Sequence, residues 1–210
     1  MKIIFYFFIG SIFGSFAHLV CQRTIKEEPS HCTYCNKKIF KRDLIPIISY
    51  INLRGKCRFC HKKIPISYLI YEIIGGLLFI FAFNDNNLIQ GIFIYLSLLI
   101  SFIISVIDLK TLEINMIYVH ILGILGIIYR IIYLKNFLEF IKILNIGDGD
   151  YFFYISLFLF LENEKIIYLL LGSVWIGAIP AIYLAIKNKS TKIIMPFCPY
   201  IFLAYMIALL

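Results

Sequence analysis

Two aspartates, Asp108 and Asp150, have the residue type and the position in the chain that catalysis could use. Asp108 lies in the segment IDLKTLEI and Asp150 closes the repeat GDGD, each where an apolar run meets a polar segment. A carboxylate at such a boundary is costly unless something compensates it, so it is a functional candidate. Two carboxylates that share a site can activate a water and protonate a leaving group. The spacing equally allows both to be helix-capping or interface residues.

Several residues close to these aspartates, or buried in apolar runs, also have a predicted role. Gly147 and Gly149 permit backbone conformations with positive φ and a close approach of a substrate strand. Asp148, between them, is interpreted as a solvated loop residue. Glu72 lies in an apolar run beside two glycines, where it could contact a substrate or proton, or could hydrogen bond to a neighbouring helix.

Four cysteines form two CxxC pairs, CTYC and CRFC, separated by 21 residues. Each pair can present two thiolates to one ion, which is the pattern of a tetrahedral zinc site, and four thiolates leave no open position for catalysis. Two disulfides are the alternative, which a reducing cytoplasm disfavours. Cys21 and Cys198 lie in or beside apolar runs and are predicted to be packing residues. The predicted zinc ligands are Cys32, Cys35, Cys57 and Cys60.

The elements that must position these residues are long apolar runs. Hydrophobic residues make up 61% of the chain and charged residues 15%, with a mean hydropathy of +0.90, which excludes an ordinary soluble domain. Most runs approach the ~20 residues that a helix needs to cross a bilayer, and none alternates like a barrel strand. We predict an all-α, polytopic membrane helical bundle of about seven or eight helices. The runs cover residues 3–20, 66–83, 88–107, 114–134, 151–161, 166–186 and 193–210.

A basic segment interrupts the apolar runs. Residues 22–65 hold eleven Lys or Arg against three acids, an excess equal to the net charge of +8 of the whole chain. Loops rich in Lys and Arg stay on the cytoplasmic side, so we expect this segment to be cytoplasmic and to contact lipids rather than nucleic acid. Counting crossings from either end of the chain places both aspartates on this same side. The predicted organisation is a first transmembrane helix (1–21), a cytoplasmic zinc-ribbon-like loop (22–65) and a transmembrane core (66–210) that contains both aspartates.

An ordered set of motifs resembles the type IV prepilin peptidases, membrane aspartic proteases that trim the leader of pilins and pilin-like proteins. GSFAHLVCQR resembles the family's GSFxNVxxxR, and the tetracysteine loop is followed, as in the family, by a glutamate-bearing helix. IDLKTLEI resembles the segment of the first catalytic aspartate, GDGD matches GxGD, and MPFCPY resembles a PFGP element. The chain departs from the family pattern at His18, Asn115 and Cys198, where Asn, Pro and Gly are usual.

The resemblance implies that Asp108 and Asp150 cleave type IV prepilins or pseudopilins after a glycine, without a catalytic metal. It places the active site and the zinc loop at the cytoplasmic face of the bacterial plasma (inner) membrane. It also implies methylation of the new N-terminus with S-adenosylmethionine as the methyl donor, although the sequence has no recognisable motif for binding this cofactor. A non-catalytic membrane assembly factor, with the zinc loop as a docking module, is the alternative.

The interval between the two aspartates is shorter than is usual in the family, which gives that alternative its weight. Residues 114–146 would span only about 50 Å as a helix, whereas two full passes need about 60 Å. We therefore predict a short or tilted hairpin whose return, RIIYLKNFLEFIKIL, is an amphipathic or interfacial helix. Its charged residues are expected near the lipid head groups: Arg130, Lys135, Glu139 and Lys142.

Overall fold

The structure is a computed structural model that describes residues 2–22, 31–32, 34–84, 87–134, 149–188 and 195–210. These residues form eight α-helices, and none of them lies in an extended strand. The predicted all-α fold is therefore confirmed for the described part of the chain. The chain divides into two compact units, Met1–Gly91 and Ile92–Leu210.

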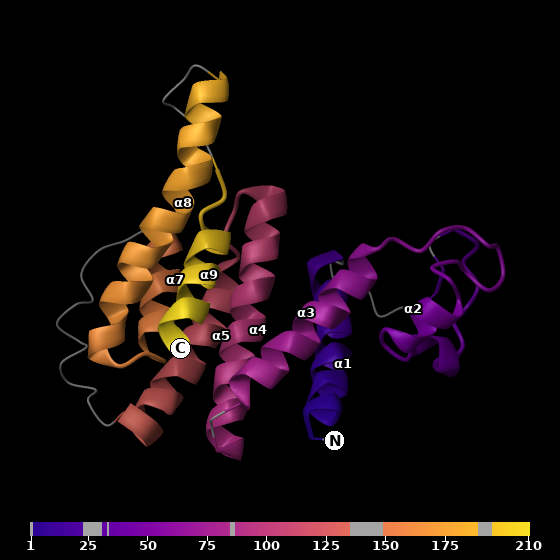
Figure 1. The fold of residues 1–210 in the computed structure, drawn as a ribbon, viewed down its shortest axis with the longest axis horizontal. Coiled ribbons are helices and arrows are strands. Elements are labelled where there is room, and N and C mark those ends of the chain that lie inside the picture. Colours follow the sequence, from indigo (N-terminus) through magenta and orange to yellow (C-terminus); the bar gives the residue numbers. More distant parts are fainter. Residues whose placement is uncertain (1, 23–30, 33, 85–86, 135–148, 189–194) are drawn as a thin grey trace. The chain divides into compact units, whose positions relative to one another are not determined.

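The first unit is built on two helices, α1 (Lys2–Gln22) and α3 (Ser67–Ala82), which lie side by side (Figure 1). Glycines make this close packing possible, because the two backbones meet where no side chain intervenes. A Cβ atom added to Gly14 would lie 2.2 Å from the carbonyl oxygen of Tyr71, and one added to Gly10 would lie 2.4 Å from a carbonyl oxygen of α3. The position of α1 against α3 thus depends on these glycines.

A second contact between the same helices involves His18, one of the residues that depart from the family pattern. Its ring is buried, and its Nε2 atom shares a hydrogen bond of 3.2 Å with the hydroxyl of Ser67. The ring centroid lies 3.9 Å from that of Tyr68 and 4.7 Å from that of Tyr71. A polar, aromatic side chain at position 18 therefore joins α1 to the start of α3.

Residues 31–65, between these two helices, fold into what we call the cysteine module. It contains the short 3-10 helix η1 (Lys41–Leu44) and the short α-helix α2 (Ile48–Asn52). Two isolated antiparallel bridges pair His31 with Lys38 and Lys56 with Lys63. The described part of the predicted zinc-ribbon-like loop is therefore a folded module.

The second unit contains most of α4 (Leu88–Thr111) and the elements that follow it. Within this unit α5 packs on α7, and α8 packs on α9 (Figure 1). Asn115 caps α5, since its side chain accepts a hydrogen bond of 3.0 Å from the backbone N–H of Ile117, which is a favoured arrangement at a helix start. The further elements are α5 (Met116–Tyr129), the π-helix η2 (Arg130–Leu134), α7 (Gly149–Phe158), η4 (Asn163–Lys165), α8 (Ile166–Asn188) and α9 (Cys198–Leu209).

Four helical segments of the described chain are long and apolar enough to cross a membrane: Lys2–Cys21, Leu88–Thr111, Met116–Leu134 and Asn163–Lys187. The helices α3, α7 and α9 are apolar but shorter. Within its own unit α8 leaves large apolar side chains exposed, with Trp175 at 73% and Ile179 at 74%. Such a surface suits lipid better than water. The chain is therefore a membrane protein.

A row of serines joins α4 to α9 inside the second unit. Ser97, Ser101 and Ser105 recur every fourth residue, so they lie on one face of α4. Ser97 shares a hydrogen bond of 2.8 Å with the hydroxyl of Tyr205, and Ser105 donates one of 3.2 Å to the carbonyl oxygen of Cys198. These bonds hold one face of α4 against α9, close to the end of α4 that carries Asp108.

Arg130 was predicted to lie near the lipid head groups. Its side chain is only 1% exposed, and the contacts that hold it are with the protein. Its guanidinium donates hydrogen bonds to the carbonyl oxygens of Phe158 (3.0 Å) and Leu161 (3.1 Å), and to the side chain of Asn163. Backbone carbonyls at and just after the end of α7 supply the acceptors that make this burial tolerable. The rest of the predicted interfacial helix, with Lys135, Glu139 and Lys142, lies outside the described residues.

Candidate functional site

The two predicted aspartates meet at a third residue. Asp108 lies near the end of α4 and Asp150 in the first turn of α7, and both belong to the second unit. Cys198, the first residue of α9, contacts both side chains. Its backbone N–H donates to Oδ2 of Asp108 at 3.0 Å, and its thiol donates to Oδ1 of Asp150 with a sulfur to oxygen distance of 3.6 Å. The structure thus brings both carboxylates to one place.

The surroundings of the two carboxylates differ. Asp108 is 5% exposed, whereas Asp150 lies at the surface of its unit. The amide that Asp108 accepts from is at the start of α9, and the N–H groups of a helix start are favourable partners for an anion. One residue of the pair is therefore buried and the other is exposed.

Cys198 has a role in the site that sequence reasoning missed. It was predicted to be a packing residue, and it is fully buried, but it also contacts both aspartates. The sequence signal for this role was the cysteine in MPFCPY, at the position where the PFGP element has glycine. Gly149 is the first residue of α7, whereas Gly147 and Asp148 lie outside the described residues.

The four predicted zinc ligands are brought together in the cysteine module. Their sulfur atoms all lie within 4.8 Å of one another, and those of Cys32 and Cys60 are 3.8 Å apart. Four sulfurs around one zinc ion at ~2.3 Å would be separated by about 3.8 Å in a tetrahedron. None of the four is in a disulfide. The donor set and its spacing fit a metal ion with four thiolate ligands.

The two CxxC turns have the same local structure. In the first, the N–H of Cys32 donates to the carbonyl oxygen of Lys37 at 3.0 Å, and the N–H of Asn36 donates back to the carbonyl oxygen of Cys32 at 2.8 Å. The second turn repeats both bonds 25 residues later, at 2.9 and 3.0 Å. Asn36 and His61 occupy equivalent positions with φ of 52° and 55°, a conformation that these residue types tolerate better than most.

Contacts across the cysteine module are also reciprocal. The ammonium group of Lys37, in the first turn, lies 5.1 Å from the ring centroid of Phe59 in the second. Lys62, in the second turn, lies 4.7 Å from the ring of Tyr34 in the first. The sequence carries this signal as a repeated pattern, CTYCNKK and CRFCHKK, which the spacing of the cysteines alone does not reveal. The basic residues beside the cysteines thus help to hold the turns together.

Cys32 and Cys60 have thiols with different pKa values. Burial by itself raises the pKa of Cys32, but hydrogen bonds from the backbone amides of Cys35 and Tyr34 and from neighbouring thiols lower it to about 6. For Cys60 the amide of Lys62 lowers the pKa, while burial and the three other thiols together raise it to about 11. The module therefore presents one thiol that ionises readily to an incoming cation, and a thiolate is the form that binds metals.

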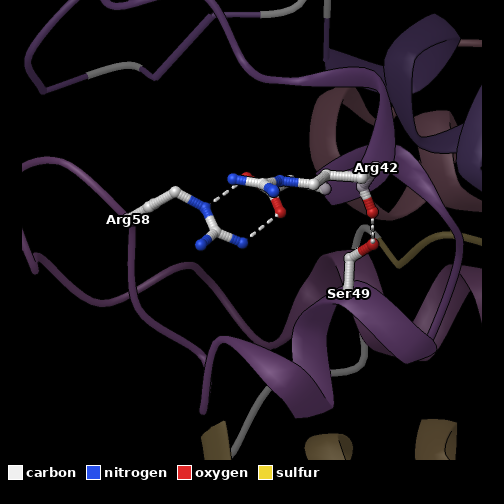
Figure 2. A network of polar contacts seen from close by, with 4 residues as sticks. Arg42, Ser49 and Arg58 are labelled. Atoms are coloured by element: carbon white, nitrogen blue, oxygen red, sulfur yellow. Dashed lines mark hydrogen bonds and ion pairs between the residues drawn. The ribbon is translucent and has the colours of Figure 1, made fainter.

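A salt bridge ties the middle of the cysteine module to its second turn (Figure 2). Arg58 donates from Nε and Nη2 to the two carboxylate oxygens of Asp43, at 2.8 and 2.6 Å. These hydrogen bonds hold the pKa of the Asp43 carboxyl below its usual range. In the same region the hydroxyl of Ser49 donates to the backbone carbonyl of Arg42 at 3.2 Å. Planar pairing of this kind fixes orientation as well as charge.

Glu72 joins three parts of the first unit. One carboxyl oxygen accepts from the hydroxyl of Ser15 on α1 at 3.0 Å, and the other accepts from the backbone N–H of Ile47 in the cysteine module at 2.7 Å. Glu72 is 8% exposed and lines, with Ser15, a cavity of about 180 Å³ that reaches Cys32 and Cys57. Of its two predicted roles, the structure shows the bond to a neighbouring helix.

These features define a class of protein: an all-α membrane protein with a module of four clustered cysteines that fit a metal ion and a pair of aspartates at helix ends. Comparison with known proteins narrows the class. Residues 8–85 match the model of the family described as Bacterial Peptidase A24 N-terminal domain. That match includes the cysteine module and Glu72 but ends before Asp108 and Asp150.

Curated relatives agree with the family match. The chain is 31% identical over 132 residues to the prepilin leader peptidase/N-methyltransferase of Vibrio cholerae serotype O1, covering 52% of this chain and 49% of that protein. It is 37% identical over 87 residues to the protein of the same name from Pectobacterium carotovorum subsp. carotovorum (40% and 30%), and 31% over 111 residues to that of Bacillus subtilis (49% and 44%).

The chain thus spans about half or less of the length of these relatives. No solved structure matches it. The comparisons confirm the similarity to the type IV prepilin peptidase family that the motifs indicate.

Proposed function

We propose that this protein is a membrane aspartic endopeptidase that cleaves the leader from type IV prepilins or pilin-like proteins. The observation that carries the proposal is the meeting of Asp108 and Asp150 at Cys198, from segments 42 residues apart in sequence. The names of the relatives support the substrate class. A non-catalytic assembly factor would have no need for two carboxylates that share one site.

The two aspartates can divide the work of peptide hydrolysis between them. One carboxylate removes a proton from a water, whose oxygen then bonds to the carbonyl carbon of the scissile peptide. The other, protonated, gives its proton to the amide nitrogen as the carbon to nitrogen bond breaks. The products are the carboxylic acid of the leader and the free amine of the mature protein, so no metal and no covalent intermediate is needed.

Residues 22–65 give the proposed orientation. Their excess of Lys and Arg favours the cytoplasmic side of the bacterial plasma membrane. The substrate's apolar helix would lie in the bilayer beside the enzyme, and its leader would meet the aspartates at the cytoplasmic face. Contacts of the enzyme outside the substrate would then be with membrane lipids, and no nucleic-acid partner is proposed.

Zinc is the proposed ion of the cysteine module, held by Cys32, Cys35, Cys57 and Cys60. Four thiolate ligands make it a structural ion that adds folding free energy to the module. Contacts within the protein stabilise the rest of the module: the Asp43–Arg58 salt bridge and the hydrogen bonds of Glu72 hold its middle part in place.

Methylation is a second proposed activity, supported by the N-methyltransferase in the names of the relatives. S-adenosylmethionine would supply the methyl group, which passes from its sulfonium to the new N-terminal amine with loss of a proton. The product is a thioether and a methylated amine.

Cleavage of a prepilin in isolated membranes tests the proposal. Membranes that contain this protein and a prepilin should release the mature form, and neither Asp108→Asn nor Asp150→Asn should do so, while both variants keep wild-type metal content. Glu164→Ala, at an exposed carboxylate of the same unit, serves as the matched control and should cleave normally. Processing of the prepilin by either Asn variant at the wild-type rate would refute the assignment. Adding S-adenosylmethionine and weighing the product by mass spectrometry tests methylation separately.

A further inference from the structure

Cys198 makes two different kinds of bond to the two aspartates. The bond to Asp108 comes from the backbone N–H, so any residue except proline at this position could make it. The bond to Asp150 comes from the thiol, so it depends on the side chain. A glycine, which the resembled PFGP element has here, keeps the first bond and cannot make the second. This chain therefore has a contact to Asp150 that its residue type supplies.

The backbone of Cys198 is held firmly enough to act as a reference point. Its N–H is bound to Asp108, and its carbonyl oxygen accepts the hydrogen bond from Ser105, so α4 holds the residue from both sides. The helix that it begins is anchored by Ile201 and Tyr205, which are both fully buried. The thiol therefore extends from a fixed position.

Asp150 is carried by a different helix. It lies in the first turn of α7, which packs mainly on α5 and has a smaller contact with α9. The thiol of Cys198 is a direct polar link from α9 to this first turn. Losing it would leave the orientation of the Asp150 carboxylate toward Asp108 less restricted.

We infer that Cys198 is a positioning residue for the carboxylate pair: its amide and thiol together hold Asp108 and Asp150 in one site. This inference rests on the proposed function, because positioning matters only if the pair is catalytic. The thiol is a hydrogen-bond donor in this arrangement and takes no part in bond making or breaking.

Purified full-length protein and a peptide that spans a prepilin cleavage site provide the kinetic test. Cys198→Ala should lower kcat about tenfold, the effect of losing one hydrogen bond to a charged group, and leave KM unchanged. Cys198→Ser retains a donor and should recover kcat to within about threefold of the wild type. Cys21→Ala, at the other cysteine outside the module, should have no effect.

Two kinetic results would overturn the inference. One is a wild-type kcat in Cys198→Ala, and the other is an equal loss in Cys198→Ser and Cys198→Ala, which would indicate that the sulfur only fills space. Cleavage that survives in Asp108→Asn would instead refute the proposed function.

An infrared measurement tests the thiol bond whether or not the protein cleaves the peptide. The difference between wild-type and Cys198→Ala spectra isolates the S–H stretch of Cys198. Asp150→Ala should move that band to higher frequency, because the thiol loses the Asp150 carboxylate as an acceptor, and Glu164→Ala should not move it. An unchanged band in Asp150→Ala would show that the thiol does not donate to Asp150, and the inference would fail even if the protease assignment held.

Discussion

Replacing Glu72 by alanine should loosen the cysteine module from the two helices that carry it. The substitution removes the acceptor for Ser15 and for the N–H of Ile47. Ile47 has φ of 63°, a region that costs a β-branched residue about 1–3 kcal/mol unless its surroundings enforce it. A hydrogen bond to a charged group contributes about 1.5–3 kcal/mol. We count the bond from Ile47 alone, at about 2 kcal/mol, because the Ser15 hydroxyl lies on a partly exposed helix face and its bond adds little.

A loss of about 2 kcal/mol corresponds to a roughly 30-fold increase in the opening equilibrium of the module. Hydrogen exchange followed by mass spectrometry measures it directly in the peptide that contains residues 45–53. Exchange in that peptide should accelerate about 30-fold in Glu72→Ala, with metal content unchanged. Glu164→Ala is the control and should exchange like the wild type.

The substitution Ile47→Gly separates the effect of the lost hydrogen bond from the effect of backbone strain at Ile47. Glycine adopts a positive φ without strain, so adding Ile47→Gly to Glu72→Ala should restore part of the lost protection. If Glu72→Ala exchanges at the wild-type rate, the carboxylate does not hold the module and the reasoning is refuted. If the double variant exchanges faster than Glu72→Ala, the backbone of Ile47 was not strained.

Three further outcomes follow from the same contacts. Gly14→Ala should prevent α1 from packing on α3 and lower the yield of folded protein severalfold. Gly123→Ala is the control and should be tolerated, because its added Cβ would meet only a serine hydroxyl at 3.3 Å. Equal yields of the two variants would contradict this prediction. After a chelator has removed the metal, iodoacetamide at pH 8 should modify Cys32 at least about tenfold faster than Cys60. At this pH a thiol with a pKa of about 6 is ionised and one with a pKa of about 11 is not. Equal rates of modification would contradict the predicted difference in acidity. Arg130→Met should lower the free energy of unfolding by about 3 kcal/mol, since buried carbonyl oxygens lose their donor, and thermal unfolding in detergent that matches the wild type would exclude this role.

Much of the fold could be predicted because the constraints are local. Apolar runs of membrane length leave helices as the way to satisfy the backbone, and each such run has a helix in the described residues. The four cysteines of the module were also predictable, since thiolates at CxxC spacing meet around one ion. Asp108 and Asp150 could be paired by counting crossings, and the structure brings them together at Cys198.

The contacts that tie these parts together could not be read from the pattern. Cys198 looked like a packing residue because its neighbours in sequence are apolar, and only the fold shows that α9 starts beside both aspartates. Arg130 looked interfacial because a charge in an apolar run usually reaches for water. Its acceptors are carbonyls at the end of another helix, 28 residues away in sequence. Such partners depend on tertiary packing, which periodicity does not encode.

The central claim is that Asp108 and Asp150 act as one unit in peptide cleavage. Its most direct test is the cleavage rate of purified Asp108→Asn, Asp150→Asn and the double variant on one prepilin peptide, with metal content and thermal unfolding checked for each. Residues that act as a unit are not additive, so each single variant should lose as much activity as the double variant. A single variant that cleaves at the wild-type rate, or two partial losses that add up in the double variant, would contradict the claim.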